Sequence, residues 1–303
     1  MNNYMICRQL EKIKFIEAAS MKEYTSFKAG GRASMLVLPK NTDELKRTLK
    51  IVATSKKESL VIGNGSNVLV KDGGYDGIII KLGEGFNQIT VNKEDKTMLI
   101  GASALLSKVA REALEAELTG FEFASGIPGT MGGALFMNAG AYGWEISQIV
   151  KEARVVARDG SREYTMPKDK MELDYRKSIF GKTGDVIISV MLKLETGEKE
   201  KISEMMKDLT ARRNEKQPMN FPSAGSFFKR PEGSYAGKLI EEAGLKGLMA
   251  GDARVSPLHA GFIINTGNAT AKDIITLMKL VQNTVYDKTG IMLEPEVRII
   301  GED

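Results

Sequence analysis

Residues Gly120–Gly143 read GFEFASGIPGTMGGALFMNAGAYG and carry the strongest local signal in the chain. The stretch has seven glycines, one proline and almost no charge. That suits neither a helix nor a strand, because each interior glycine loses much backbone freedom on folding. Exposed N–H groups in glycine turns form nests for anions, so the stretch predicts a phosphate-binding loop. A loop that only lets two sheets pack closely is the structural alternative, and glycine content alone leaves it open.

A second glycine turn, Gly63–Asn67, lies between the strands expected at Ser59–Ile62 and Val68–Val70. A dinucleotide-binding Rossmann unit would have strand, glycine turn and helix, with G-x-G-x-x-G in the turn. Here another strand follows and the third glycine is replaced by Val68, so we reject the Rossmann interpretation. The turn can still present N–H groups to a phosphate, although a plain β-turn explains it locally as well.

The length and composition of the chain limit the number of domains and the classes of ligand to be expected. A chain of 303 residues exceeds what one core usually serves, so we expect two or three domains. Lys and Arg exceed Asp and Glu by 43 − 39 = 4, a mild excess that suits anionic small molecules. Basic and acidic residues are interleaved, which argues against a nucleic-acid-binding stripe.

The chain has one cysteine, Cys7, and one histidine, His259. We therefore expect no internal disulfide and no His/Cys metal cluster. His259 is expected to be a structural or surface histidine. The N-terminus lacks the continuous apolar core of a signal peptide, and no run approaches a membrane span. We expect a cytoplasmic protein.

The periodicity predicts an α+β region with a mixed or antiparallel sheet from about residue 20 to about 195. Asp159-Gly160 predicts a β-hairpin, and Asn41 and Thr270 predict helix starts. Further expected elements are a helix over Gln9–Ala19, a charged helix over Gly197–Lys216, a short helix over Tyr235–Ala243 and a last strand over Leu293–Ile300.

Three polar residues lie in settings that suit catalysis. Arg176 lies in DYRKSIF, expected to run into a strand; Ser226 lies between a glycine and two phenylalanines; Glu296 lies in the expected last strand. Each also has a plain interpretation, as a surface cation, a loop hydroxyl and an edge carboxylate. The chain has no P-loop, no G-x-S-x-G elbow and no histidine placed for a hydrolase triad.

Six segments occur in a fixed order: TSFKAGGRA, GNGSNVLV, GIPGTMGGALFMNAGAYG, DYRKSIF, AGSFFKRP and LEPEVR. In these segments the chain resembles the UDP-N-acetylenolpyruvoylglucosamine reductases, flavoenzymes of peptidoglycan synthesis. The resemblance runs from about residue 20 to the end. The short interval from Arg176 to Ser226 resembles the form of the family without a substrate-shielding insertion.

The resemblance implies an α+β fold with a two-subdomain FAD-binding region of the vanillyl-alcohol-oxidase type, followed by a smaller substrate domain. The implied ranges are 1–82, 83–200 and 201–303. FAD would be bound without a covalent link, because His259 and Cys7 fall outside the flavin region. The implied FAD-binding residues are Gly63, Asn64, Gly65, Ser66, Asn67, Ser125, Gly126, Ile127, Pro128, Gly129, Thr130, Gly132 and Gly133.

The resemblance also implies the reaction, in which NADPH reduces FAD and leaves. The enolpyruvyl ether of UDP-N-acetylglucosamine then takes hydride from flavin N5. Arg176 and Glu296 would stabilise the enediolate, and Ser226 would donate a proton to the adjacent carbon. Lys229 is implied as a partner for substrate phosphate. The implied biology is cell-wall synthesis, cell shape and division, with a monomer or weak dimer and no nucleic-acid or membrane partner.

Two rivals remain at this point. One is another FAD-dependent oxidoreductase of the same fold, such as an alcohol oxidase. The other is a non-catalytic nucleotide-binding protein in which the glycine loops hold phosphate and nothing reacts.

Overall fold

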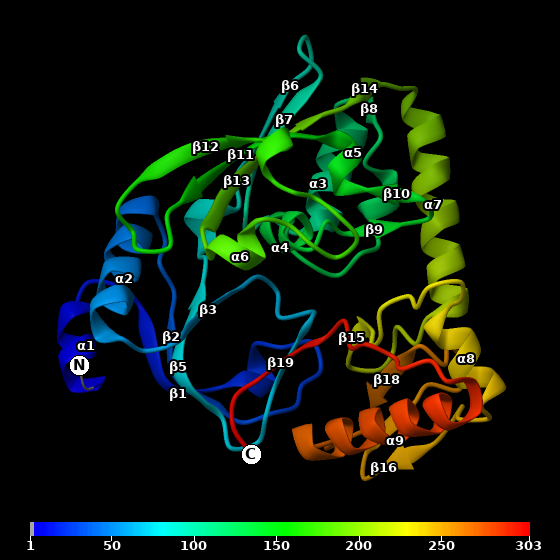
Figure 1. The fold of residues 1–303 in the computed structure, drawn as a ribbon. Helices are drawn as coiled ribbons and strands as arrows, with labels where there is room; N and C mark the ends of the chain where they lie inside the picture. The colour runs from blue at the N-terminus through cyan, green and yellow to red at the C-terminus, as the bar shows by residue number, and fades with distance from the viewer. Residues whose placement is uncertain (1–2) are drawn as a thin grey trace. The chain divides into compact units, whose positions relative to one another are not determined.

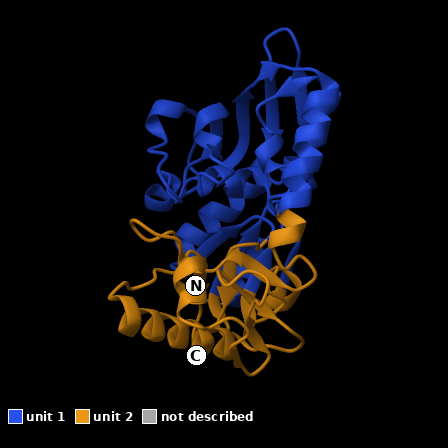
Figure 2. Cartoon of the chain, turned by 90° about the vertical axis from the view of Figure 1, so that its right-hand side faces the viewer, with its two compact units in different colours: residues 1–16, 35–64, 77–212 blue, residues 17–34, 65–76, 213–303 orange. Residues whose placement is uncertain are grey.

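The computed structural model describes residues 3–303, which form two compact units (Figure 2). Unit 1 comprises residues 1–16, 35–64 and 77–212, of which residues 1 and 2 are not described. Unit 2 comprises residues 17–34, 65–76 and 213–303. Each unit has its own cluster of buried apolar side chains. The division into three domains stays a prediction.

Nine helices run through the described residues (Figure 1). Their bounds are α1 Asn3–Gln9, α2 Thr42–Ser55, α3 Leu106–Glu115, α4 Met131–Phe136, α5 Ile146–Ile149, α6 Phe180–Thr183, α7 Lys199–Lys216, α8 Ala236–Glu242 and α9 Ala271–Thr289.

Two larger sheets precede α7. A four-stranded sheet has the order β1 (Phe15–Ser20), β2 (Arg32–Val37), β5 (Tyr75–Lys81), β3 (Ser59–Ile62). An antiparallel five-stranded sheet has the order β12 (Glu163–Pro167), β11 (Val150–Val156), β13 (Val186–Lys193), β7 (Thr97–Gly101), β6 (Ile89–Asn92) (Figure 1). The mixed or antiparallel sheet expected from the sequence is therefore confirmed.

In unit 2 a four-stranded sheet has the order β15 (Ser223–Ser226), β18 (Phe262–Asn265), β17 (Ala253–Val255), β16 (Met249–Ala250). Three two-stranded pairs complete the strands: β9 (Gly140–Ala141) with β10 (Trp144–Glu145), β8 (Leu118–Thr119) with β14 (Glu195–Thr196), and β4 (Val68–Val70) with β19 (Arg298–Ile300). The β4–β19 pair is parallel and joins residues far apart in the chain.

Local signals placed several elements correctly. The Asn41 side chain caps α2 by accepting from the Glu44 N–H at 2.9 Å, and Thr270 and Asp273 form the expected capping box of α9. The strands on either side of Asp159-Gly160 pair as an antiparallel hairpin. In each case neighbouring residues alone supply the stabilising contacts.

Two expected elements were wrong in extent. A helix was predicted over Gln9–Ala19, but the observed helix α1 already ends at Gln9, and Phe15–Ser20 forms the strand β1. Pairing of β1 with β2 overrides a weak helical periodicity there. The last strand is only Arg298–Ile300, so Glu296 precedes it.

Candidate active site

The turn Gly63–Asn67 joins β3 to β4, and its central amides are notable for their lack of acceptors among residues 3–303. Within the described part of the chain, the backbone N–H groups of Asn64, Gly65 and Ser66 donate no hydrogen bond. Gly65 has a φ of +63°, and a Cβ there would lie 2.0 Å from the carbonyl oxygen of Tyr24. Only glycine fits, and the turn presents an anion-binding nest of N–H groups.

The loop Ser125–Gly133 has the same property. Among the described residues, no acceptor meets the backbone N–H groups of Gly126, Gly129 and Thr130. The hydroxyl oxygen of Ser125 is buried and likewise has no partner there. An unsatisfied buried polar group destabilises a protein by about 1–3 kcal/mol unless a ligand or water satisfies it. The loop is therefore built for a ligand rich in oxygen.

Within unit 1, Gly63, the first residue of the Gly63–Asn67 turn, packs against the Ser125–Gly133 loop. A Cβ added at Gly63 would lie 2.3 Å from Oγ1 of Thr130. The loop Ser125–Gly133 is anchored in turn, since the N–H of Gly132 donates to the carbonyl of Ala102 at 2.9 Å. Taken separately, the unengaged amides of each segment and the orphaned hydroxyl of the second are donors that suit the diphosphate and hydroxyl groups of FAD.

Arg176 lies at the tip of a tight turn in which Asp174 and Lys177 exchange backbone hydrogen bonds. Its φ is +54°, a left-handed conformation that is strained for a bulky residue and recurs at functional sites. The guanidinium stacks over the ring of Tyr175 at 4.9 Å. The sequence placed Arg176 on a segment entering a strand; instead α6 intervenes before β13.

The turn around Arg176 is fastened to the end of the glycine-rich stretch. Asn138 donates through Nδ2 to the carbonyl of Asp174 at 3.2 Å. The Ser178 hydroxyl donates to the carbonyl of Phe136 at 2.6 Å. Phe136 ends α4, whose first residues, from Met131, are the last of the Ser125–Gly133 segment. Unit 1 thus holds Arg176 in a fixed relation to the predicted flavin loop.

Ser226 and Glu296 are brought together in unit 2. Ser226 is the exposed last residue of β15, and half-buried Glu296 lies opposite the next residue along. The Glu296 N–H donates to the carbonyl of Phe227 at 2.8 Å, and the Lys229 N–H donates to that of Glu294 at 2.8 Å. These two stretches, distant in sequence, therefore run side by side.

Asn67 anchors Glu296 from a third direction. Its Nδ2 donates to the backbone carbonyl of Glu296 at 3.1 Å, and its own carbonyl accepts from the N–H of Arg298 at 3.1 Å. The last residue of one glycine turn thus fixes the main chain on both sides of Val297. Arg176 belongs to unit 1, whereas Ser226 and Glu296 belong to unit 2. Convergence of the three stays a prediction.

Lys229, predicted to meet substrate phosphate, forms an ion pair with Glu294. Its ammonium is partly neutralised in this structure. A phosphate would have to compete with that carboxylate, so Lys229 stays the least supported of the predicted residues.

His259 has a structural setting, as expected. Burial lowers the pKa of its imidazole below the ordinary 6.5. Its Nδ1 accepts from the N–H of Gly261 at 3.0 Å, and its ring meets that of Phe262 at 5.0 Å. Within the described residues no group of His, Cys, Asp or Glu is arranged to hold a metal.

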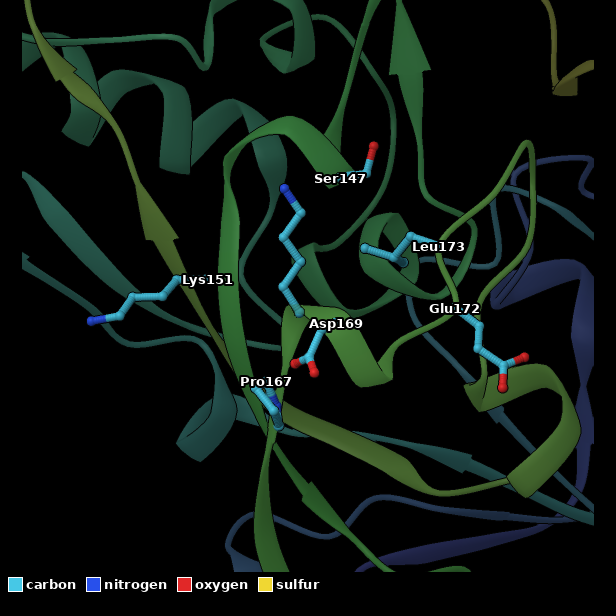
Figure 3. A pocket seen from close by; sticks show the side chains of 7 residues that line it. Ser147, Lys151, Pro167, Asp169, Glu172 and Leu173 are labelled. Carbon is cyan, nitrogen blue, oxygen red and sulfur yellow. The ribbon is translucent and has the colours of Figure 1, made fainter.

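A shallow hollow of about 520 Å³ lies elsewhere on unit 1 (Figure 3). Its lining residues are Ser147, Lys151, Pro167, Lys168, Asp169, Glu172 and Leu173. The Lys151 side chain points away from the other labelled side chains, and Glu172 is paired with Lys182 at 2.5 Å. None of the predicted site residues lines this hollow.

Comparison with known families assigns both halves of the chain. Residues 33–164 match an FAD binding domain, and residues 217–300 match the C-terminal domain of UDP-N-acetylenolpyruvoylglucosamine reductase. The reductase of that name from Clostridioides difficile is 50% identical over 283 residues, covering 93% of this chain and 92% of the relative. The chain belongs to the UDP-N-acetylenolpyruvoylglucosamine reductase family.

Another family member, from Clostridium botulinum strain Alaska E43, is 51% identical over 287 residues and covers 95% and 93% of the two chains. The solved structure of the family enzyme from Thermus caldophilus is 35% identical, with a TM-score of 0.81 and coverage of 95% and 98%. These similarities confirm the predicted fold class, the FAD cofactor and the assignment as an FAD-dependent oxidoreductase. No helix among the described residues has the length and apolarity to cross a membrane.

Two features of the site escaped sequence reasoning. One is Lys81, whose ammonium donates to the carbonyl of Gly63 at 2.5 Å. The other is the anchoring of Glu296 by the Asn67 side chain. The only sequence feature that marks Lys81 is its position as a charged residue directly after the apolar run Ile78–Ile80. Nothing in the sequence marks the Asn67 contact, since it joins positions 229 residues apart.

Proposed function

We propose that this chain reduces the enolpyruvyl ether of UDP-N-acetylglucosamine to UDP-N-acetylmuramate, with NADPH as the electron donor. One observation carries the proposal: the two family matches cover the glycine turns and two of the three proposed catalytic residues. The FAD-binding match covers both glycine turns, and the C-terminal match covers Ser226 and Glu296. Arg176 lies between the two matched ranges.

When bound, FAD supplies hydride chemistry between NADPH and the substrate. The chain's own part is to hold ligands and to manage charge and one proton. The backbone amides of the glycine turns, which are unengaged within the described residues, would hold the FAD diphosphate, and the Ser125 hydroxyl would find a partner on the same cofactor. Because Cys7 precedes the flavin region and His259 lies outside it, we expect FAD to be bound without a covalent link.

Hydride addition at the methylene carbon leaves negative charge on the substrate carboxylate as an enediolate. Arg176 binds that carboxylate, because its planar fork of donors matches the two oxygens. Its strained backbone and its links to the end of α4 fix the direction of the guanidinium. Donors that are already fixed need no reorganisation as the charge develops, and such electrostatic stabilisation supplies much of the rate enhancement in many enzymes.

Ser226 donates a proton to the carbon next to the carboxylate, and Glu296 polarises the arrangement. A serine hydroxyl is a weak acid, but a carbanion-like centre accepts from it when the two are about 3 Å apart. The paired backbones of Phe227 and Glu296 set the relation of the hydroxyl to the carboxylate. The exposure of Ser226 leaves its Oγ accessible to substrate.

The function is tested with purified, yellow protein. We expect NADPH oxidation to depend on UDP-N-acetylenolpyruvoylglucosamine and to yield UDP-N-acetylmuramate, identified by mass. NADPH or alcohol oxidation that consumes oxygen and ignores the nucleotide-sugar would instead establish an oxidase of the same fold. Colourless protein that binds nucleotide-sugar without turnover would establish a binding protein.

The remaining expectations are part of the same proposal. We place the protein in the cytoplasm as a monomer or weak dimer, with FAD-binding subdomains over 1–82 and 83–200 and a substrate domain over 201–303. Gel filtration with light scattering measures the oligomeric state, and fractionation of cells measures the location.

A further inference from the structure

Lys81 lies where the first glycine turn begins. It is the last residue of β5 and, in the parallel register, pairs with Ile62, which ends β3 directly before Gly63. Its Nζ donates to the carbonyl of Gly63 at 2.5 Å. Gly63 in turn is the residue whose added Cβ would meet Thr130. The Lys81 ammonium is therefore held at the junction of the two glycine segments.

This ammonium is half-buried and has no acidic partner in the part of the chain that the structure describes. No ion pair to Lys81 exists among the described residues. Burial lowers its pKa below the ordinary 10.5, and no carboxylate of the described chain offsets that shift. A desolvated charge without a counter-charge is unfavourable, so such groups are usually paired or bind an ion.

An anionic ligand at the turn would supply the missing charge. The amides of Asn64, Gly65 and Ser66, which follow the Gly63 carbonyl that Lys81 meets, have no acceptor among the described residues and favour the same sign of ligand. FAD carries its negative charge on the diphosphate, whereas its isoalloxazine and adenine rings are uncharged when oxidised. A charge-assisted contact to phosphate is roughly twice as strong as a neutral hydrogen bond.

We infer that Lys81 is an FAD-binding residue: it fixes the first peptide of the Gly63–Asn67 turn and places its positive charge against the cofactor's diphosphate. The inference rests on FAD being the cofactor in the proposed function. It adds a side-chain cation to a site otherwise built from main-chain amides and the Ser125 hydroxyl.

The test compares FAD release from the holoprotein of the parent, Lys81→Met, Lys81→Arg and Lys193→Met. Lys193 is the matched control, because its Nζ also donates to a backbone carbonyl, that of Asp95, away from the turn. Flavin fluorescence after dilution gives the FAD dissociation constant at rising KCl, and dye equilibration gives the flavin midpoint potential. Neither measurement contains NADPH or nucleotide-sugar.

We expect Lys81→Met to raise the dissociation constant about tenfold or more, which is 1.4 kcal/mol per tenfold. The same substitution should flatten its dependence on KCl, since salt screens the lost attraction. Lys81→Arg should keep both the affinity and the salt dependence, and Lys193→Met should match the parent. The midpoint potential should stay unchanged, because the charge faces the diphosphate and not the flavin ring.

Parental affinity in Lys81→Met would overturn the inference. So would equal weakening in Lys81→Met and Lys81→Arg with an unaltered salt dependence, which would mean that Lys81 only supports the fold. A shifted potential would place the ammonium at the ring and also contradict it. If Lys81→Met does not fold, the dependence of the FAD dissociation constant on KCl is measured in the parent and in Lys81→Arg. A dissociation constant that does not change with KCl in either protein would overturn the inference. A failure of substrate turnover would leave these FAD measurements standing.

Discussion

In the proposed reaction, the Ser226 hydroxyl takes part in flavin reoxidation by the substrate and not in flavin reduction by NADPH. Ser226 is an exposed residue at the end of β15, and the segment that follows it pairs with the one that carries Glu296. In Ser226→Ala we expect flavin reduction by NADPH to proceed nearly as in the parent, because no proton is needed from this side chain. Flavin reoxidation by the enolpyruvyl substrate should slow by on the order of 10²-fold or more. Stopped-flow absorbance resolves the two halves, and equal slowing of both would remove Ser226 from the proton-donor role.

Arg176 allows a matched comparison. Its guanidinium stacks over Tyr175 at 4.9 Å, and that of Arg162 stacks over Tyr164 at the same distance. We expect Arg176→Lys to lower kcat by about 10²-fold, because an ammonium cannot grip a carboxylate with two parallel hydrogen bonds. Arg162→Lys should leave steady-state rates unaltered. If Arg176→Lys turned over at the parental rate, the enediolate assignment would be wrong.

Gly63 tests the close approach of the two glycine segments. A methyl group there would lie 2.3 Å from Oγ1 of Thr130, so Gly63→Ala should displace the loop and weaken FAD retention. Replacing Thr130 by alanine removes that oxygen and leaves its Cβ 3.5 Å away. Gly63→Ala/Thr130→Ala should therefore retain more FAD than Gly63→Ala alone, measured as flavin per protein after desalting. Gly181→Ala, whose added atom would be 3.9 Å from the Phe136 ring, is the control.

At the scale of elements, the Asn67 side chain links a glycine turn to the residues before β19. In Asn67→Ala the hydrogen bond to the Glu296 carbonyl is lost. We expect a loss of about 1 kcal/mol in the free energy of unfolding and slower flavin reoxidation, while FAD held by main-chain amides stays bound. Asn92→Ala, which removes a surface contact to Asp95, controls for the loss of an amide. Parental reoxidation kinetics in Asn67→Ala would show that Glu296 needs no such anchor.

The elements that the sequence predicted well are those stabilised by their neighbours in the chain. The caps of α2 and α9 depend on residues three apart, and the hairpin β11–β12 depends on its turn. The segment 10–19 was mispredicted because its partner β2 lies further along the chain. Glu296 was placed in a strand because Leu293–Ile300 is apolar at alternate positions, but its actual partner is the segment after Ser226.

For the site, glycine content predicted two anion-binding turns, and both turns have amides without acceptors among the described residues. The catalytic roles of Arg176, Ser226 and Glu296 stay predictions. The Lys81–Gly63 and Asn67–Glu296 contacts could not be predicted, because each depends on which strands become neighbours. Lys81 reaches Gly63 only through the parallel register of β3 and β5. A lysine at the end of a strand is otherwise an ordinary surface residue.

At the scale of the molecule, His259 gives unit 2 a pH response. Its pKa in the folded chain lies below 6.5, whereas the unfolded chain titrates near the ordinary value. Above pH 6.5 both states are neutral, so His259 contributes no pH dependence. As pH falls below 6.5 the unfolded state binds the proton first, and stability is lost until the folded pKa is passed.

We therefore expect His259→Gln to lose less thermal stability than the parent as the pH falls below 6.5. A glutamine can still accept from the Gly261 N–H, which keeps the local contact. The difference in Tm between variant and parent, measured against pH, isolates the histidine from the carboxylates. A difference that stays constant across this range would contradict the assignment.

The parallel pairing of β4 with β19 has a consequence for how the protein is made. Unit 2 gathers residues 17–34 and 65–76 with residues 213–303, and the strand that pairs with β4, at residues 298–300, is made long after β4 itself. A nascent chain can bury the apolar side chains of unit 1 earlier, but Leu69 and Phe27 must wait for partners that follow residue 213. Until those residues have been made, the two early segments remain open to chaperones and proteases. Deleting β19 should therefore lower the yield of intact protein in cells far more than deleting as many residues from a surface loop.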